Sequence, residues 1–238
     1  MNTVIFDLDG TLLPMPSQEL FVETYFQALA KKLAAYEKQP KEFIGAVGAA
    51  TAAVIKNDGT MTNEQRFWEQ FCSLLGDSAV ELEPVFEHFY QNEFAEVKET
   101  TSLHPHAREC IKTLKRKGYE VILATNPLFP RIATVTRMLW AGLDPEDFEL
   151  ITTYENSSFC KPNINYYKEI LATIKKQPEE CIMIGNDVKE DMCVATLGMK
   201  TFLLKDCLIC PEDERIDHLQ QGDIDDLLKM IEELPALS

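Results

Sequence analysis

The sequence lacks a long apolar run and an excess of positive charge, and both absences exclude classes of function. No stretch approaches about 18 consecutive apolar residues, so no membrane-spanning helix is predicted. Lys and Arg total 23 against 39 Asp and Glu, which gives a formal net charge of −16. Because non-specific binding to nucleic acid or anionic lipid needs clustered cations, we expect neither partner.

Glycine, proline and cysteine are also too few for several classes of chain. The 10 Gly and 12 Pro exclude a collagen-like or low-complexity sequence, and 45% hydrophobic residues are typical of a globular protein. The 7 Cys are odd in number and irregularly spaced, so a disulfide framework is not expected. Reduced thiols, together with an N-terminus that begins directly with a strand-like segment, predict a cytoplasmic protein.

Short apolar runs alternate with helical patterns over most of the chain, which predicts a doubly wound α/β fold with a parallel sheet. Helical patterns lie near 105–117, 131–141, 163–176 and 189–197. The expected strands are Thr3–Leu8, Tyr119–Ala124, Phe148–Thr152, Cys181–Ile184 and Lys200–Leu204.

The segment from Pro14 to about Thr100 interrupts this alternation. It contains no convincing strand, and at least four helices are expected in it. Capping boxes are predicted at Thr62–Gln65 and Ser78–Glu81, and Gly76 is the expected end of the helix between them. We therefore predict a core of residues 1–13 plus 101–238 and a small helical domain, residues 14–100, lying over the ligand-binding edge of the sheet. The acidic tail from residue 206 onward receives no structural or functional assignment.

The first expected strand ends in Asp7-Leu8-Asp9-Gly10-Thr11. Side chains two apart on an extended strand point the same way, so Asp7 and Asp9 should lie together. Burying two like charges is costly without a cation, whereas Gly10 allows a tight turn whose N–H groups could bind an anion. The alternative is an ordinary strand-end turn with two solvated acids.

Three further segments place polar groups at or near strand ends. Taken singly, Thr125 and Asn126 could be a turn or helix cap, and Lys161 could be a solvated surface residue. Asp187 and Asp191 are four apart and could simply cap a helix. Because the carboxyl ends of parallel strands share one edge, these groups can instead converge with the first acidic pair. Carboxylates suit Mg²⁺, and a Lys, a hydroxyl and loop N–H groups suit a phosphoryl group beside it.

The order, types and spacing of these residues resemble the haloacid dehalogenase superfamily of aspartate-nucleophile phosphatases, with a Rossmann-like core and a helical cap. The resemblance covers nearly the whole chain except the acidic tail. It implies that Asp7 is the nucleophile, which forms an aspartyl-phosphate, and that Asp9 is the general acid and base. It also implies a small-molecule phosphate ester as substrate and Mg²⁺ as cofactor.

The same resemblance implies roles for the remaining positions. Thr125, helped by Asn126, would hold the phosphoryl oxygens, and Lys161 would offset negative charge. Mg²⁺ would be bound by Asp7, the backbone carbonyl of Asp9, and Asp187, with Asp191 in support. Many relatives have Gly directly followed by the metal-binding Asp, whereas Asn186 intervenes in this chain.

Three alternatives to a phosphatase stay open from the sequence. A phosphomutase of the same family would differ mainly in what accepts the phosphoryl group. A receiver domain also uses Asp, Thr, Lys and Mg²⁺, but its acceptor Asp comes later in the chain and it has no helical insertion. A non-catalytic phosphate-binding regulator could keep the same fold, although every catalytic position here is filled. The sequence sets no oligomeric state.

Overall fold

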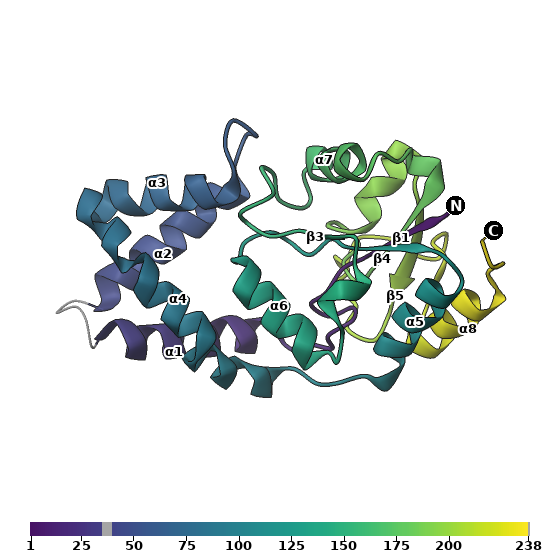
Figure 1. The fold of residues 1–238 in the computed structure, drawn as a ribbon, viewed down its shortest axis with the longest axis horizontal. Coiled ribbons are helices and arrows are strands. Elements are labelled where there is room, and N and C mark those ends of the chain that lie inside the picture. Colours follow the sequence, from purple (N-terminus) through teal and green to yellow (C-terminus); the bar gives the residue numbers. More distant parts are fainter. Residues whose placement is uncertain (35–39, 238) are drawn as a thin grey trace.

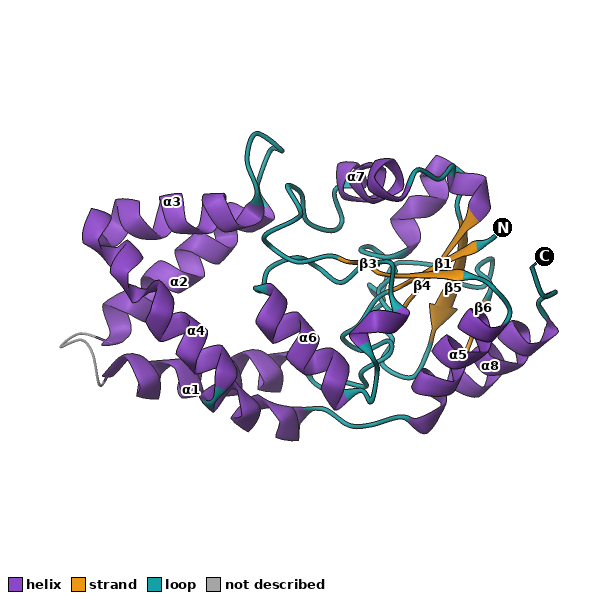
Figure 2. Cartoon of the chain, viewed as in Figure 1, coloured by secondary structure: helices purple, strands orange, loops and turns teal. Residues whose placement is uncertain are grey.

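The computed structural model describes residues 1–34 and 40–237. Its centre is a six-stranded sheet in which every paired neighbour is parallel, in the order β3-β2-β1-β4-β5-β6 (Figures 1 and 2). The strands are β1 (Thr3–Phe6), β2 (Glu120–Leu123), β3 (Leu150–Ile151), β4 (Cys181–Gly185), β5 (Lys200–Leu204) and β6 (Gln221–Gly222).

Helices cover both faces of this sheet, which confirms the predicted doubly wound α/β fold. On β1 the alternation is direct, since Val4 and Phe6 pack into one apolar cluster and Ile5 packs into another on the opposite face. The first cluster receives side chains from α5 (Pro105–Arg116) and α8 (Ile224–Glu233), and the second from α7 (Ile164–Ile174). Figure 1 places α5 and α8 together on one side and α7 on the other.

Between β1 and α5 the described residues form helices and loops and no β-strand, apart from an isolated bridge between Asp9 and Leu13. These helices form their own apolar cluster, rich in aromatic rings, beside the carboxyl edge of the sheet (Figure 1). We refer to residues 18–100 as the helical segment; positions 35–39 lie outside the described residues. Its helices are α1 (Gln18–Ala34), α2 (Pro40–Ile55), α3 (Asn63–Leu75) and α4 (Glu83–Gln91), with the 3-10 helices η1 (Asp77–Leu82) and η2 (Glu93–Thr100).

Helix α6 (Arg131–Trp140) joins the two parts of the molecule. Its Ala133 packs in the cluster of the helical segment, whereas Met138 packs in the cluster of the sheet. Phe129, just before the helix, contacts the rings of Phe21 and Tyr25 on α1 at centroid distances of 6.4 and 5.4 Å. Helix α6 therefore packs against both the helical segment and the sheet.

Two capping signals had different outcomes. Thr62 caps α3 as predicted: its hydroxyl accepts from the Gln65 N–H at 3.2 Å, and the Gln65 side chain accepts from the Thr62 N–H at 3.0 Å. Gly76 ends the helix, also as predicted. The box predicted at Ser78 is wrong, because 77–82 form the 3-10 helix η1 without a side-chain cap. The next α-helix begins at Glu83, where Pro84 suits the first turn.

The helix predicted near 189–197 is also wrong in type, since only the 3-10 helix η5 (Met192–Leu197) forms there. The Asp191 carboxylate accepts from the Asp187 N–H at 3.0 Å, which closes a turn where the first helical turn was expected. The acidic tail, which received no prediction, contains β6 and α8; a capping box between Asp223 and Asp226 starts this helix. No helix in the described ranges combines the length and apolar character needed to cross a membrane.

Candidate active site

The loop after β1 is fixed by neighbouring backbone and by the side chain of Asn186. The Asp7 N–H donates to the Ile184 carbonyl at 2.9 Å, so the first acidic residue continues the pairing with β4. Gly10 has φ +83°, and a Cβ there would lie 2.4 Å from the Asn186 amide nitrogen. The Thr11 hydroxyl donates to Asn186 Oδ1 at 2.9 Å. A glycine is therefore required at this turn, both by its conformation and by the close approach of Asn186.

Lys161 is a buried cation held between two carboxylates. Its Nζ lies 2.7 Å from Asp7 Oδ1 and 2.6 Å from Asp191 Oδ1, and its side chain is 1% exposed. Burial alone would lower the pKa of Lys161, but the charges of Asp191 and Asp7 raise it well above its ordinary value. Lys161 is therefore a permanent positive charge that orients the Asp7 carboxylate.

Asp187 lies in the turn that follows β4 and lines the cavity beside Asp7. Its Oδ1 accepts from the backbone N–H groups of Lys189 and Glu190 at 2.8 and 2.9 Å. These bonds fix the carboxylate without a side-chain cation, and no ion pair to Asp187 is found among the described residues.

The loop after β2 presents Thr125 and Asn126. The Thr125 carbonyl accepts hydrogen bonds from the hydroxyls of Thr152 and Tyr166, both at 2.8 Å, and these two bonds fix the backbone at Thr125. The Asn126 amide group donates to both carboxylate oxygens of Glu190, at 3.2 and 3.1 Å. Asn126 Oδ1 is buried and has no hydrogen-bond partner in the described chain.

Asp9 faces a cation that sequence reasoning missed. One oxygen, Oδ2, forms an ion pair with the guanidinium of Arg137 on α6, and Oδ1 is buried without a partner among the described residues. Arg137 is 1% exposed and stacks over Phe129 at 4.7 Å from the ring centroid. Burial raises the pKa of Asp9; Arg137 opposes this shift, and the charge of Asp7 adds to it.

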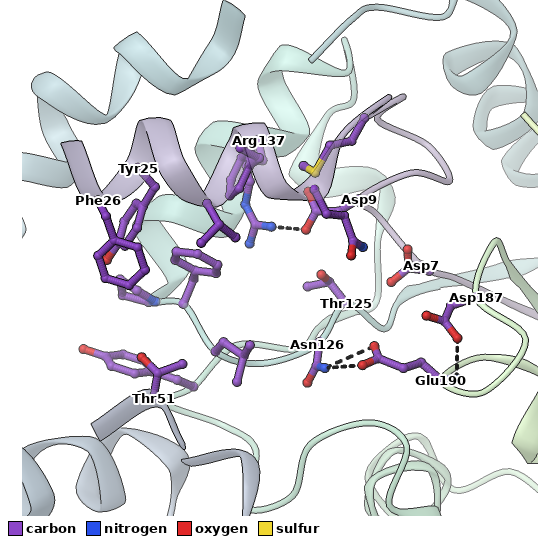
Figure 3. A pocket seen from close by; sticks show the side chains of 18 of the residues that line it. Asp7, Asp9, Tyr25, Phe26, Thr51, Thr125, Asn126, Arg137, Asp187 and Glu190 are labelled. Atoms are coloured by element: carbon purple, nitrogen blue, oxygen red, sulfur yellow. Dashed lines mark hydrogen bonds and ion pairs between the residues drawn. The ribbon is translucent and has the colours of Figure 1, made fainter. Parts of the chain in front are cut away.

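The structure brings all seven predicted site residues together. Six line one cavity of about 330 Å³, and the seventh, Lys161, lies behind Asp7 and Asp191. Figure 3 shows the acidic groups on one side of this cavity and Tyr25 and Phe26 across it. The six are Asp7, Asp9, Thr125, Asn126, Asp187 and Asp191.

Arg137 and Glu190 also line the cavity, and no role was predicted for them. A signal for Arg137 exists in the sequence, because it is three and four positions from Thr134 and Ala133 on the buried face of α6. Glu190 had no distinguishing signal within an acidic run. Burial raises its pKa, and the nearby Asp187 and Asp7 add to this effect.

The donors at the carboxyl edge of the sheet suit a hard divalent cation. Asp7, Asp187, Asp191 and Glu190 line the cavity. Lys161 pairs with two of them, Asp7 and Asp191, and Arg137 pairs with Asp9. This leaves an excess of negative charge that a cation would compensate. Within the described ranges no three His, Cys, Asp or Glu side chains are grouped as a metal site. A Mg²⁺ ion at this site would therefore be bound by two carboxylates, Asp7 and Asp187, and its remaining ligands would be a backbone oxygen and water.

The acidic cavity lies at the carboxyl edge of a doubly wound sheet, where α/β proteins bind their ligands. Residues 1–193 match the family of haloacid dehalogenase-like hydrolases, and the chain belongs to this family. Among curated relatives, the pyrophosphatase PpaX of Bacillus cereus is 27% identical over 206 residues, 84% of this chain and 82% of the relative. The glyceraldehyde 3-phosphate phosphatase of Methanothermobacter thermautotrophicus is 30% identical over 122 residues, 51% of each chain.

A solved phosphatase of the same superfamily, from Thermococcus onnurineus, has a similar fold. The two chains align over their full lengths with a TM-score of 0.60 at 16% identity. The predicted membership of the haloacid dehalogenase superfamily is thus confirmed, and phosphatases are among the curated relatives of this chain.

Proposed function

We propose that the protein is a Mg²⁺-dependent phosphatase that hydrolyses a small-molecule phosphate monoester, with Asp7 as the nucleophile. The observation that carries the proposal is the placement of Asp7. Its carboxylate is oriented by the buried Lys161 at 2.7 Å and opens onto a cavity that also contains Asp9. A fixed, accessible carboxylate beside a second acid is the arrangement that covalent and general acid–base catalysis requires.

In the first step, a carboxylate oxygen of Asp7 bonds to phosphorus as the bond between phosphorus and the ester oxygen breaks. Asp9, which also lines the cavity, gives a proton to the departing alcohol. In the second step Asp9 takes a proton from water, whose oxygen attacks the phosphorus. Inorganic phosphate leaves and the Asp7 carboxylate is restored.

The other groups would act by electrostatics and position. Thr125, at the end of β2, would donate a hydrogen bond to a phosphoryl oxygen, while Lys161 offsets the charge that accumulates beside Asp7. Asp7, Asp187 and the Asp9 carbonyl would hold Mg²⁺, with Asp191 in support through Lys161. The bound cation would neutralise phosphoryl charge so that a carboxylate can approach it. The helical segment would act as a cap that excludes water from the site.

The experiment is phosphate release from p-nitrophenyl phosphate and a panel of metabolite monoesters, with Mg²⁺ and with EDTA. Asp7→Asn removes the nucleophile and should lower kcat by about a thousandfold or more. Asp213→Asn, which changes an exposed carboxylate of the acidic tail, is the matched control and should keep full activity.

Acid quenching with a ³²P-labelled ester should trap label on the wild type and none on the Asp7→Asn variant. Metal-independent turnover, or turnover that survives Asp7→Asn, would contradict the proposal. Isomerisation of a sugar phosphate without phosphate release would instead favour the phosphomutase alternative.

A further inference from the structure

The cavity has two chemically different ends. At the sheet it is lined by carboxylates, and toward the helical segment it is lined mainly by apolar and aromatic side chains. Figure 3 shows this contrast, with Tyr25 and Phe26 across the cavity from Asp7 and Asp187. Three helices supply most of the rings: Phe21, Tyr25 and Phe26 lie on α1, Phe67 and Trp68 on α3, and Phe86 and Tyr90 on α4. Phe129 and Tyr154, in loops of the sheet domain, complete the ring set.

The helical segment contributes few polar side chains to the cavity, namely Gln18 and Thr51 besides its tyrosines and Trp68. The hydroxyls of Tyr25 and Tyr90 hydrogen-bond to each other at 2.9 Å, so each ring presents mainly its apolar surface. Among the described lining residues Arg137 is the one cation, and its charge is already paired with Asp9. A second phosphate or a carboxylate on the substrate would therefore meet no free positive charge at this end.

A second, smaller cavity of about 250 Å³ lies beyond the aromatic rings and strengthens this conclusion. It shares Trp68, Phe86 and Tyr90 with the first cavity. Its remaining wall includes Glu64 and Glu155. Burial and the charges of neighbouring Glu155 and Glu83 raise the pKa of Glu64, and no ion pair compensates these carboxylates within the described ranges. The far end of the site therefore repels anions.

We propose that the physiological substrate is a phosphate monoester whose alcohol carries an aromatic ring, or an apolar group of similar size, and no negative charge. This inference rests on the proposed phosphatase function and adds the class of leaving group. The ring would pack among the aromatic side chains of α1, α3 and α4, and the phosphoryl group would lie at Asp7. Apolar lining with a few polar groups at one end is typical of sites for ligands of this kind.

The proposed substrate differs from those after which two relatives, the pyrophosphatase and the glyceraldehyde 3-phosphate phosphatase, are named. Pyrophosphate has a leaving group that is itself anionic, and glyceraldehyde 3-phosphate has a small polar one. Neither would use the aromatic wall, and pyrophosphate would be opposed by the glutamates beyond it.

The test compares three esters whose alcohols differ in size and charge but not greatly in leaving-group reactivity, and adds pyrophosphate, an anhydride with a more reactive leaving group. We would measure kcat/KM for 2-phenylethyl phosphate, n-propyl phosphate, phosphoglycolate and pyrophosphate. Since a single methylene group in a fitted apolar pocket changes kcat/KM by about tenfold or more, 2-phenylethyl phosphate should exceed n-propyl phosphate by at least that factor. Phosphoglycolate and pyrophosphate should be poorer still.

Two variants of α1 link the preference to the cavity. Phe26→Ala removes a ring that lines the cavity and should bring the two alkyl esters closer together in kcat/KM. Leu20→Ala shortens an apolar side chain of the same helix that is 51% exposed and outside the cavity, so it should leave the ratio unchanged. Calorimetric titration of folded Asp7→Asn protein with both esters provides a reading that does not depend on turnover.

The outcomes separate the two proposals. Turnover of p-nitrophenyl phosphate combined with equal use of all esters, or with a preference for phosphoglycolate or pyrophosphate, would overturn the substrate class alone. A ratio that Phe26→Ala and Leu20→Ala alter equally would do the same. Failure to hydrolyse any ester would overturn the phosphatase proposal and the substrate class with it.

Discussion

Arg137 and Asp9 form an ion pair although 128 residues separate them in the sequence. Arg137 comes from α6, which the helical segment and the sheet share, and Asp9 comes from the loop after β1. The pair therefore links the acid proposed for proton transfer to the wall of the aromatic cavity. Phe129 stacks against the same guanidinium, 4.7 Å from the ring centroid.

Replacing Arg137 with Met should destabilise the protein and impair catalysis together. The change leaves a mostly buried carboxylate without its cation, and removing one partner of such a pair costs about 3 kcal/mol. Urea unfolding should report this loss, and kcat should fall because Asp9 loses the group that orients it. Arg131→Met, at an exposed position of the same helix, should leave both measurements nearly unchanged. Equal stability of the two variants would contradict the structural importance of the pair.

Lys161→Met should lower the free energy of unfolding by about 3–5 kcal/mol, because Asp7 and Asp191 are then left facing each other in a buried site. Phosphatase activity should be lost as well, since nothing then orients the Asp7 carboxylate. The matched control is Lys168→Met on α7, whose side chain is exposed. A Lys161→Met protein as stable as this control would show that the buried charges are compensated in another way.

Two glycine-to-alanine changes should have opposite effects on stability. A Cβ at Gly185 would lie 2.2 Å from Asp191 Cγ, so Gly185→Ala should displace Asp191 from Lys161 and cost about 1–3 kcal/mol. Gly45, in α2, has no atom within 4 Å of the corresponding position. Gly45→Ala should therefore stabilise the helix by about 0.5–1 kcal/mol. Thermal unfolding of both variants checks the prediction, which fails if the signs agree.

Asn63 connects the helical segment to the loops that carry the site. Its N–H donates to the Ser157 carbonyl at 2.8 Å, and its side-chain amide donates to the Pro127 carbonyl at 3.2 Å. Asn63→Ala leaves the Pro127 carbonyl buried and without this donor, so we expect a loss of about 2 kcal/mol in unfolding free energy.

The control for this change is Asn165→Ala, at an exposed position early in α7. Chemical denaturation would give the loss of unfolding free energy for each of the two variants. A loss at position 63 no larger than that at position 165 would mean that the side-chain contact to Pro127 contributes little to stability.

Much of the core fold was predictable because its strands are continuous apolar runs. β1 and β4 are fully buried on both faces, and such strands leave a clear pattern in the sequence. Parallel strands present their carboxyl ends at one edge of the sheet, whereas the pairing of β1 with β4 was not predicted. The shared edge alone was the basis for bringing Asp7 and Asp187 together.

What escaped prediction depended on tertiary contacts or on how the acidic composition was weighed. Arg137 was missed because the partner of a helix face is set by packing, and Asp9 lies far away in the chain. α8 was missed for another reason. Ile224, Leu227 and Ile231 are spaced as on one helix face, but this short apolar pattern lies within a strongly acidic tail and is weak there.

The shared position of α6 bears on how this protein could be rebuilt. A graft that exchanged residues 18–100 for the corresponding segment of a relative would leave Phe129 and Ala133 facing a foreign surface, with their apolar area exposed or mismatched. The natural unit for recombination is thus discontinuous, combining the helical segment with the first half of α6. Selection for a new leaving group would therefore act on the helical segment and on the first half of α6 together, although the two are distant in the sequence.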